Sequence, residues 1–395
     1  MGWGYLRAIA QDHDVWALVD GWEFGEELRR YQANHLEELK RVHFVFVPCK
    51  PHPLLRKLWP PSYYWFYNLW HRRAYRIARK LHAEIHFDAA WKLSMVTYRE
   101  PGYLWRLPIP FVWGPVGALG YTDWRLLPML GLRGGFEYLV RNVINWLHSH
   151  VKRRPRLAAR KANSYEALIA ATGENQREMS RLWHVDSVVS SEIGIMNVED
   201  AIEKSNGPLK IVWCGQFTRG KALPLLLWAL ARVKNHLPIK STLDVIGDGA
   251  MRVRWMRLAE RLGLAQMITW HGWVKRAEAI RVQKSSNVSV ITSIRDLTST
   301  VLVESLACGN PVICLDHCGF SDVVNETCGI KVPVGWSRDV VDGFAKALVV
   351  LSDTARRMAL STGAVRRARE FLWEEKRRTL CRLMANVGSR VGNNS

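Results

Sequence analysis

The chain has 395 residues, of which 48% are hydrophobic, so it can form two ordinary domains with buried cores and is not expected to be disordered. Lys and Arg outnumber Asp and Glu by 56 to 36, and the net charge of +20 predicts attraction to polyanions such as nucleic acid, anionic lipid or phosphorylated ligands. Zinc-finger spacing, an RNA-binding aromatic signature and a basic tail are all missing from the sequence, so we expect no nucleic-acid partner.

Short β-branched runs alternate with helix-length segments along the whole chain, which predicts parallel sheets with right-handed crossovers. Strands are predicted at 13–20, 43–48, 87–94, 109–115 and 166–172, and then at 209–215, 241–247, 267–272, 287–293 and 311–316. A polar stretch at 196–210 divides the two series. We therefore predict two doubly wound α/β domains, an N-terminal one at 1–196 and a C-terminal one at 197–374. We expect a last helix, from about 375 to 395, to pack back on the first domain.

An aromatic and basic segment at 59–82 predicts a helix. Such a helix either packs its aromatic face on the first sheet or lies on an anionic membrane surface. No apolar run reaches the ~18–20 residues that span a bilayer, and residues 1–14 lack the apolar block of a signal peptide. The seven scattered cysteines indicate reduced thiols. We expect a cytoplasmic protein, with peripheral contact to the inner face of the membrane as the alternative.

Two acids, Asp296 and Glu304, flank the start of a predicted short helix after the strand at 287–293. Thr298, Ser299 and Thr300 can cap this helix, and a capped helix N-terminus attracts phosphate. Glu304 could then accept two hydrogen bonds from a ribose diol, and Asp296 could bind hydroxyls of the group attached to the phosphate. The alternative is a plain capping loop with a solvated Asp296 and with Glu304 paired to an arginine.

The stretch from Asp296 through Glu304, Ser305 and the segment 307–312 resembles the donor-binding signature of family 4 retaining glycosyltransferases (glycosyl transferases group 1), which have the GT-B fold. The segments 212–230, 243–250, 270–274 and 318–335 resemble further elements of the same domain. The segments 113–120 and 170–179 are similar to a bacterial subgroup. The resemblance implies two Rossmann-like domains that face a cleft.

The resemblance implies an enzyme that transfers a hexose-type sugar from a UDP- or GDP-sugar to an acceptor hydroxyl, in polysaccharide or glycolipid synthesis. It implies neither a cofactor nor a metal, and we read the cysteines and histidines at 308–328 as small buried groups without a metal-binding knuckle. The expected partners are the nucleotide sugar and a sugar or lipid-linked acceptor. A catalytically weak nucleotide-sugar-binding protein and a sugar-nucleotide epimerase remain alternatives.

The resemblance also assigns roles in the donor loop. Lys221 aligns with the donor-loop lysine, and Arg219 is a second cation that could stabilise the departing diphosphate. Gly215 and Gln216 belong to the same loop, and Gln216 stands where the family usually has arginine. We assign catalytic roles to Lys221, Arg219 and Asp296.

Other predicted donor-side residues are Gly247 and Gly249, which would let the backbone approach the nucleotide, and His271 near the base. The alternatives to these donor-side roles are an ordinary turn at the two glycines and a buried His271 that is hydrogen-bonded within the protein. On the acceptor side, Trp91 and Lys92 stand where relatives often have histidines.

The start of the chain predicts a short helix followed directly by a strand. In the family such a helix follows a central strand and a Gly-rich loop that contacts donor phosphate and acceptor. Gly2 and Gly4 resemble the end of that loop, and the N-terminal domain lacks its first strand. We therefore expect Met1 to be a late start or a fragment boundary, and the first domain to be weakened.

Overall fold

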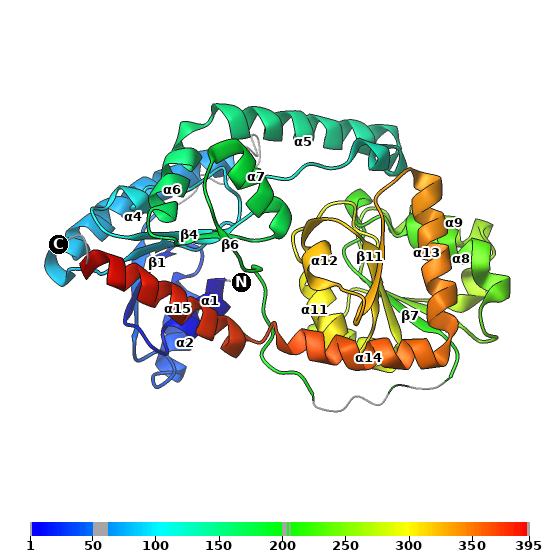
Figure 1. The fold of residues 1–395 in the computed structure, drawn as a ribbon. Helices are drawn as coiled ribbons and strands as arrows, with labels where there is room; N and C mark the ends of the chain where they lie inside the picture. The colour runs from blue at the N-terminus through cyan, green and yellow to red at the C-terminus, as the bar shows by residue number, and fades with distance from the viewer. Residues whose placement is uncertain (1, 50–61, 200–203, 205–206, 393–395) are drawn as a thin grey trace.

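The computed structural model describes residues 2–49, 62–199, 204 and 207–392. Parallel sheets form two units that stand side by side in Figure 1, one built around β4 and the other around β7. All ten strands predicted from the sequence are present, together with two short strands, β6 and β12, that were not predicted.

The second unit holds one six-stranded parallel sheet in the order β12-β11-β10-β7-β8-β9. Its strands are β7 (Lys210–Cys214), β8 (Thr242–Ile246), β9 (Ile268–Gly272), β10 (Val288–Ile291), β11 (Val312–Leu315) and β12 (Gly329–Val332). The helical elements between and after them are η3 (Arg219–Lys221), α8 (Pro224–Val233), η4 (Lys234–His236), α9 (Arg252–Arg261), η5 (Ala265–Met267), α10 (Arg276–Ser285), α11 (Thr300–Ala307), α12 (Cys318–Val323), α13 (Ser337–Ser352) and α14 (Thr354–Arg369). This is the usual doubly wound order 3-2-1-4-5-6, with β7 as the first strand.

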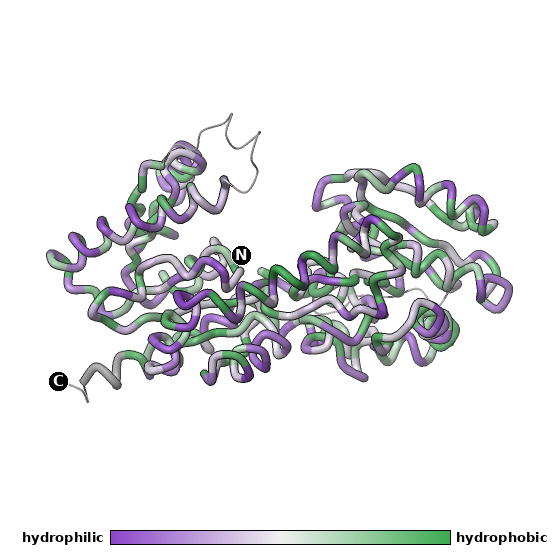
Figure 2. The backbone as a smooth tube through the Cα atoms, turned by 90° about the horizontal axis from the view of Figure 1, so that it is seen from above, coloured by the Kyte–Doolittle hydropathy of each residue, from purple (hydrophilic) through white to green (hydrophobic). Residues whose placement is uncertain are grey.

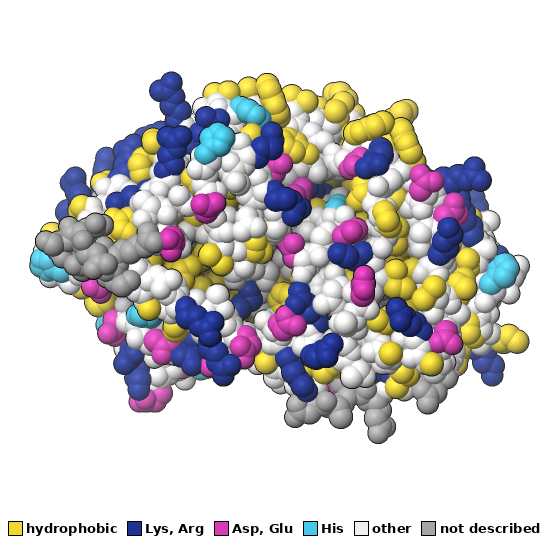
Figure 3. Space-filling model, in the orientation of Figure 1, with side chains coloured by type: hydrophobic (Ala, Val, Ile, Leu, Met, Phe, Trp, Pro, Cys, Tyr) yellow, Lys and Arg dark blue, Asp and Glu magenta, His cyan; other side chains and the backbone are white. Residues whose placement is uncertain are grey.

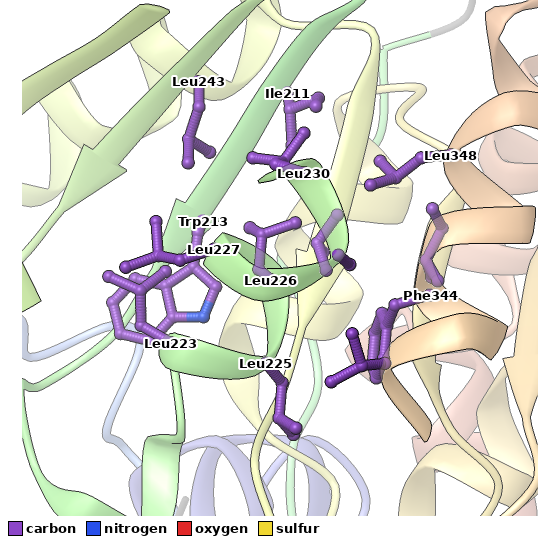
Figure 4. Close-up of a cluster of buried hydrophobic side chains, with 14 of the residues drawn as sticks. Ile211, Trp213, Leu223, Leu225, Leu226, Leu227, Leu230, Leu243, Phe344 and Leu348 are labelled. Carbon is purple, nitrogen blue, oxygen red and sulfur yellow. The ribbon is translucent and has the colours of Figure 1, made fainter. Parts of the chain in front are cut away.

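Helices cover both faces of this sheet because its strands are apolar on both sides. Ile211 and Trp213 of β7 point to a core shared with α8 and α13, whereas Val212 faces a cluster with Val282 of α10. Figure 4 shows the first of these cores, where leucines of α8 lie between β7 and Phe344 of α13.

The first unit holds two separate parallel sheets, β1-β2 and β3-β4-β5-β6. The strands are β1 (Val15–Asp20), β2 (Val42–Val47), β3 (Ala90–Lys92), β4 (Phe111–Val116), β5 (Leu168–Ala170) and β6 (Val188–Val189). The helical elements are α1 (Gly2–Ile9), α2 (Gly25–Asn34), α4 (Ser62–Ile85), η1 (Leu104–Arg106), η2 (Trp124–Leu130), α5 (Gly131–Val151), α6 (Arg153–Asn163) and α7 (Gly173–Trp183).

The break between these two sheets lies where the sequence predicts a missing central strand. In the part of the chain that the structure describes, β1 pairs with β2 alone and β3 with β4 alone. All six residues of β1 are half-buried, whereas all six residues of β4 are buried. One edge of β1 and one edge of β3 are thus without a strand partner among the described residues.

The C-terminal helix α15 (Trp373–Gly392) covers one face of the larger sheet in the first unit. Leu380 and Leu383 of α15 share a core with Tyr5 of α1 and with Val112 and Ile169 of the sheet. The two passages of the chain between the units lie together, because Ile195 accepts a hydrogen bond from the Trp373 amide and donates one to Phe371, both at 3.0 Å. The exact division at residues 196 and 374 stays a prediction.

Helix α5 and the preceding η2 join the two units along the upper edge in Figure 1. Leu126 and Leu130 of η2 are buried in the core of the second unit, although they precede α5 in the first half of the chain. Trp124 of η2 also stacks edge-on against Trp336, with ring centroids 4.9 Å apart. None of the helices in the described ranges is both long enough and apolar enough to cross a membrane.

Candidate functional site

The second sheet reverses its order between β7 and β10, and the loops after these two strands meet there. In doubly wound sheets, ligands bind at this switch point, outside the carboxyl ends of the strands. The amide of Ile294 donates to the Gly220 carbonyl at 2.8 Å. The Thr292 hydroxyl donates to the Lys221 carbonyl at 2.6 Å and accepts from the Trp213 indole at 2.9 Å. These bonds hold the loops at 215–221 and 292–299 against each other.

Lys221 and Asp296 form an ion pair at this junction, with 2.5 Å between Nζ and Oδ2. About a quarter of each side chain is exposed, 28% for Lys221 and 24% for Asp296, so a ligand can reach both. The other carboxylate oxygen of Asp296 accepts a hydrogen bond from the Leu297 amide at 3.0 Å. The sequence-predicted cation and acid therefore lie together at the switch point, although 75 residues separate them in the chain.

Glu304 is buried in the second turn of α11. Its Oε1 accepts a hydrogen bond from Arg276 at 2.8 Å. The Arg276 side chain is 75% exposed, and such a pair contributes little because water competes for the guanidinium. An arginine partner was the alternative to a ribose-binding role, and the exposed position of Arg276 leaves room for a ligand to replace it.

The three predicted capping residues have different surroundings. Thr298 is buried, and both its amide and its hydroxyl donate to the Glu192 carboxylate at 3.0 Å, so its hydroxyl hydrogen is already used. Ser299 precedes α11 with a φ of 72° and makes no side-chain cap. Thr300 is the first residue of α11. Strained backbone of this kind is concentrated at ligand sites.

The predicted glycines pack against the donor loop itself. A Cβ on Gly247 would lie 2.0 Å from the Gly215 carbonyl oxygen, and one on Gly249 would lie 2.9 Å from the Phe217 oxygen. Both glycines also have positive φ, 127° and 150°. A side chain is therefore excluded both by the close contact and by the backbone conformation. Gln216 is exposed between these contacts. The glycines thus allow the two loops to approach each other.

Four further predicted residues lie outside this junction. His271 on β9 forms a hydrogen bond through Nε2 with Oδ1 of Asp244 on the neighbouring β8, at 2.6 Å. This is the contact expected of a histidine that is hydrogen-bonded within the protein. The Arg219 side chain lies beside Gly134 of α5 and lines a small pocket between η2, α8 and α9. Gly2 and Gly4 lie in the first turn of α1 rather than in a loop, and Gly4 packs against the Trp373 ring.

The first unit contributes polar groups that the sequence analysis did not identify. Arg295 donates to the Glu174 carboxylate at 2.8 Å and to the Tyr121 carbonyl at 2.9 Å. The amide of Gly173, at the start of α7, donates to Asp322 of α12 at 2.7 Å. Arg295 adjoins Asp296, and Glu174 follows the helix cap Thr172, which accepts from the Asn175 amide at 3.2 Å. The cap was a detectable signal for α7, whereas the partner of Glu174 is 121 residues away.

Lys92 lies at the end of β3 but points into the first unit. Its Nζ donates to the Tyr67 hydroxyl of α4 at 3.1 Å and to the Ser94 carbonyl. Burial lowers the pKa of Lys92 to about 7. The neighbouring Trp91 indole donates to the Gly114 carbonyl at 2.9 Å. Lys92 therefore holds α4 to the sheet in this structure.

All seven cysteines are free thiols. Within the described ranges, His, Cys, Asp and Glu side chains form no group of three that could hold a metal ion. The predictions of no metal and no cofactor stay predictions.

Residues 197–361 match the family model described as Glycosyl transferases group 1. A curated relative from Campylobacter jejuni, an N-acetylgalactosamine-N,N'-diacetylbacillosaminyl-diphospho-undecaprenol 4-alpha-N-acetylgalactosaminyltransferase, is 27% identical over 45% of this chain and 46% of its own length. A D-inositol 3-phosphate glycosyltransferase from Geodermatophilus obscurus is 31% identical over 42% of this chain and 37% of its own. The chain spans less than half the length of these relatives. The matches support the group 1 glycosyl transferase family for the second half of the chain.

Solved structures extend the likeness to nearly the whole chain. Anabaena HepE in complex with UDP covers 97% of this chain and 95% of its own, with a TM-score of 0.61 at 14% identity. Sucrose-phosphate synthase from Thermosynechococcus elongatus covers 89% and 84%, with a TM-score of 0.57 at 15% identity. At such identities the likeness shows the fold, and it confirms the GT-B architecture expected from the sequence.

Proposed function

We propose that this chain is a glycosyltransferase that moves a hexose-type sugar from a UDP- or GDP-sugar to an acceptor hydroxyl and retains the anomeric configuration. The main support is one observation: Lys221 and Asp296 meet at the switch point of the second sheet, beside the N-terminus of α11. This junction lies within the residues that match the family model. The likeness to a structure in complex with UDP supports a nucleoside diphosphate as the leaving group.

Cleavage of the donor leaves negative charge on the diphosphate, and a fixed cation lowers the barrier. Lys221 supplies such a cation, and the N-terminus of α11 adds backbone N–H groups with a favourable dipole. Glu304 is suited to bind the ribose hydroxyls in exchange for Arg276. Asp296 holds Lys221 and is placed to bind a hydroxyl of the donor sugar. Because these charges come from the chain itself, the proposal needs no metal.

We further propose a sugar or lipid-linked acceptor, polysaccharide or glycolipid synthesis, and a place in the cytoplasm at the inner face of the membrane. The name of the Campylobacter relative includes a diphospho-undecaprenol acceptor, which supports a lipid-linked one here. In α4, basic side chains including Arg72, Arg76 and Arg79 are exposed, while Ala74 and Ala78 are buried. Residues 62–82 of the predicted 59–82 membrane segment can thus pack against the first unit and still present basic side chains to a membrane. Residues 59–61 lie outside the described residues.

A second candidate is a nucleotide-sugar-binding protein with weak turnover. Gln216 brings no charge to the donor loop, and Lys92 is buried in a structural contact. These features favour binding over catalysis.

Calorimetric titration with UDP and GDP, followed by incubation with the matching sugar nucleotides, tests both candidates. The glycosyltransferase proposal predicts binding of one diphosphate in the micromolar to millimolar range typical of substrates, and release of that nucleotide when a donor and acceptor are present. Binding without turnover would support the second candidate. Failure to bind either diphosphate would contradict both.

A further inference from the structure

Helix α5 is inverted in its second half: the buried side chains there, Asn145 and Ser149, are polar. Asn145 is buried, and its amide donates to the carbonyls of Leu119 and Gly120 at 2.9 and 3.0 Å. Its Oδ1 accepts from Arg99 at 2.7 Å. One turn earlier, Asn142 exchanges two hydrogen bonds with the backbone of Thr122, at 3.0 and 2.8 Å. Specific polar bonds therefore hold this helix on the protein, where a surface helix usually uses an apolar stripe.

The opposite side of α5 presents apolar side chains to solvent. Leu132 is 97% exposed, Phe136 69%, Val143 58%, Leu147 48% and Val151 64%. Their spacing of four, seven, four and four residues puts them on one face along the whole helix. We call these five residues, with Leu139, Val140, Ile144 and Trp146, the α5 apolar face; each of the nine is at least 38% exposed.

Figure 3 shows hydrophobic side chains along the upper edge of the molecule, where α5 runs in Figure 1. In the view from above in Figure 2, α5 crosses between the two units with long hydrophobic stretches on its tube. Contiguous exposed apolar surface of this kind marks an interaction site in soluble proteins.

The charge around the α5 apolar face is strongly positive. Residues 131–163 contain eight Lys and Arg and a single acid, Glu137. Arg133, Arg153 and Arg160 are exposed near the two ends of α5 and on α6. An apolar helix face with basic flanks and an exposed tryptophan is typical of helices that lie in the headgroup region of anionic bilayers.

A second copy of the chain is a poorer fit to this surface. A helix of this length is roughly 32 Å long and about 10 Å wide, which offers on the order of 300 Å². A stable dimer interface buries about 800 Å² on each partner. Self-association across α5 would also bring the basic flanks of both copies together.

We propose that α5 docks the protein on an anionic bilayer, with the α5 apolar face in the headgroup region and the exposed Arg133, Arg153 and Arg160 against the lipid phosphates. The first turns of α5 contact the donor loop, because Gly134 lies beside Arg219 and the Tyr138 hydroxyl lies beside Gly220. Docking through α5 holds the Lys221 loop close to the membrane surface. This inference does not depend on glycosyl transfer, and it places the main membrane contact on α5 rather than on 59–82.

Vesicle co-sedimentation of the full chain tests the proposal. One set of vesicles contains phosphatidylcholine alone, and the anionic set contains equal amounts of phosphatidylcholine and phosphatidylglycerol. The wild-type protein should pellet with the anionic vesicles, and Phe136→Glu with Val143→Glu should reduce the bound fraction about tenfold or more. A control pair, Ile239→Glu with Val253→Glu, removes exposed apolar side chains elsewhere and should bind as the wild type does. Circular dichroism checks that each variant is folded.

Three results would overturn the proposal. The wild-type chain could remain in the supernatant with both vesicles. The α5 variant could bind normally while Arg76→Glu with Arg79→Glu loses binding, which would assign the contact to α4. Light scattering could show a wild-type dimer that Phe136→Glu dissociates, which would mean that a second copy covers the α5 apolar face.

Discussion

Glu304 and Arg276 form a pair whose two members should respond oppositely to mutation. If Glu304 binds a ribose, Glu304→Gln loses a charged hydrogen bond worth about 1.5–3 kcal/mol, a loss of roughly 10- to 100-fold in nucleotide affinity. Arg276→Gln frees the carboxylate and should leave affinity equal to or better than that of the wild type. Calorimetry measures both, with Glu326→Gln on an exposed loop as the matched control. Equal losses in both variants would mean that the pair is structural.

Lys92 predicts a pH dependence of stability. Its folded pKa of about 7 lies below the unfolded value of ~10.4, because burial disfavours the charge. Between these values the unfolded chain binds more protons, so Lys92 adds a rise of up to about 1.4 kcal/mol per pH unit to the free energy of unfolding. Below pH ~7 the penalty for charging the buried amine is fully present.

In thermal unfolding between pH 7 and 9, Lys92→Met should flatten this rise. The exposed Lys346→Met on α13 is the control and should keep the wild-type slope. Buried Lys376, whose pKa is also lowered to about 7 by burial, keeps part of the rise in every variant. An unchanged slope in Lys92→Met would show that Lys92 is not buried in the folded protein.

At this scale the sequence could predict residue types but not their partners. Asp296 stood out as an acid in the loop after a buried strand, and Lys221 stood out because its loop resembles the donor loop of the family. Arg276, Glu174 and Glu192 did not, because their partners lie 28, 121 and 106 residues away and only the fold brings them together. Arg219 adjoins the correct loop, but the loop turns its side chain toward α5.

At the scale of the strand, the break between β1 and β3 should be visible in hydrogen exchange. β7 has partners on both sides, whereas β1 is paired with β2 alone in the described residues and each of its residues is half-buried. Amides of 15–20 should therefore exchange earlier than those of 210–214, since unpaired N–H groups are open to water. β9 is the edge strand of an intact sheet, so it is the control for the effect of an unpaired edge on exchange. Protection of β1 equal to that of β7 would contradict the separate sheets.

Strands were predictable because β-branched runs bounded by turns are a strong local signal. β6, with two residues, was too short to stand out, and β12 has the sequence GIKV, in which Gly329 and Lys331 interrupt the apolar run. The inverted α5 could not be predicted, because periodicity reveals that a helix has two unlike faces but not which one meets the protein. Its polar contacts with Thr122 and Leu119 are long-range and exist only after folding.

For the whole molecule, the contact between Arg295 and Glu174 should limit the separation of the two units. Both side chains are about one-fifth exposed, 19% for Arg295 and 23% for Glu174. Glu174→Ala therefore removes the carboxylate that pairs with the largely buried Arg295 guanidinium and leaves it bonded to the Tyr121 carbonyl. We expect a larger radius of gyration by small-angle scattering and a lower melting temperature. Glu178→Ala removes a surface pair on the same helix and should change neither. If both variants match the wild type, other contacts such as η2 hold the units together.

The central claim is that Lys221, held in place by Asp296, stabilises a departing diphosphate. Single-turnover release of nucleotide from the sugar donor tests it most directly. Lys221→Ala should lower the turnover rate by about 10²-fold or more, because the cation is needed most when charge develops on the leaving group. Its donor affinity should fall far less, and Lys346→Ala should leave both quantities unchanged. Unaltered turnover in folded Lys221→Ala, or a loss confined to donor affinity, would contradict the account.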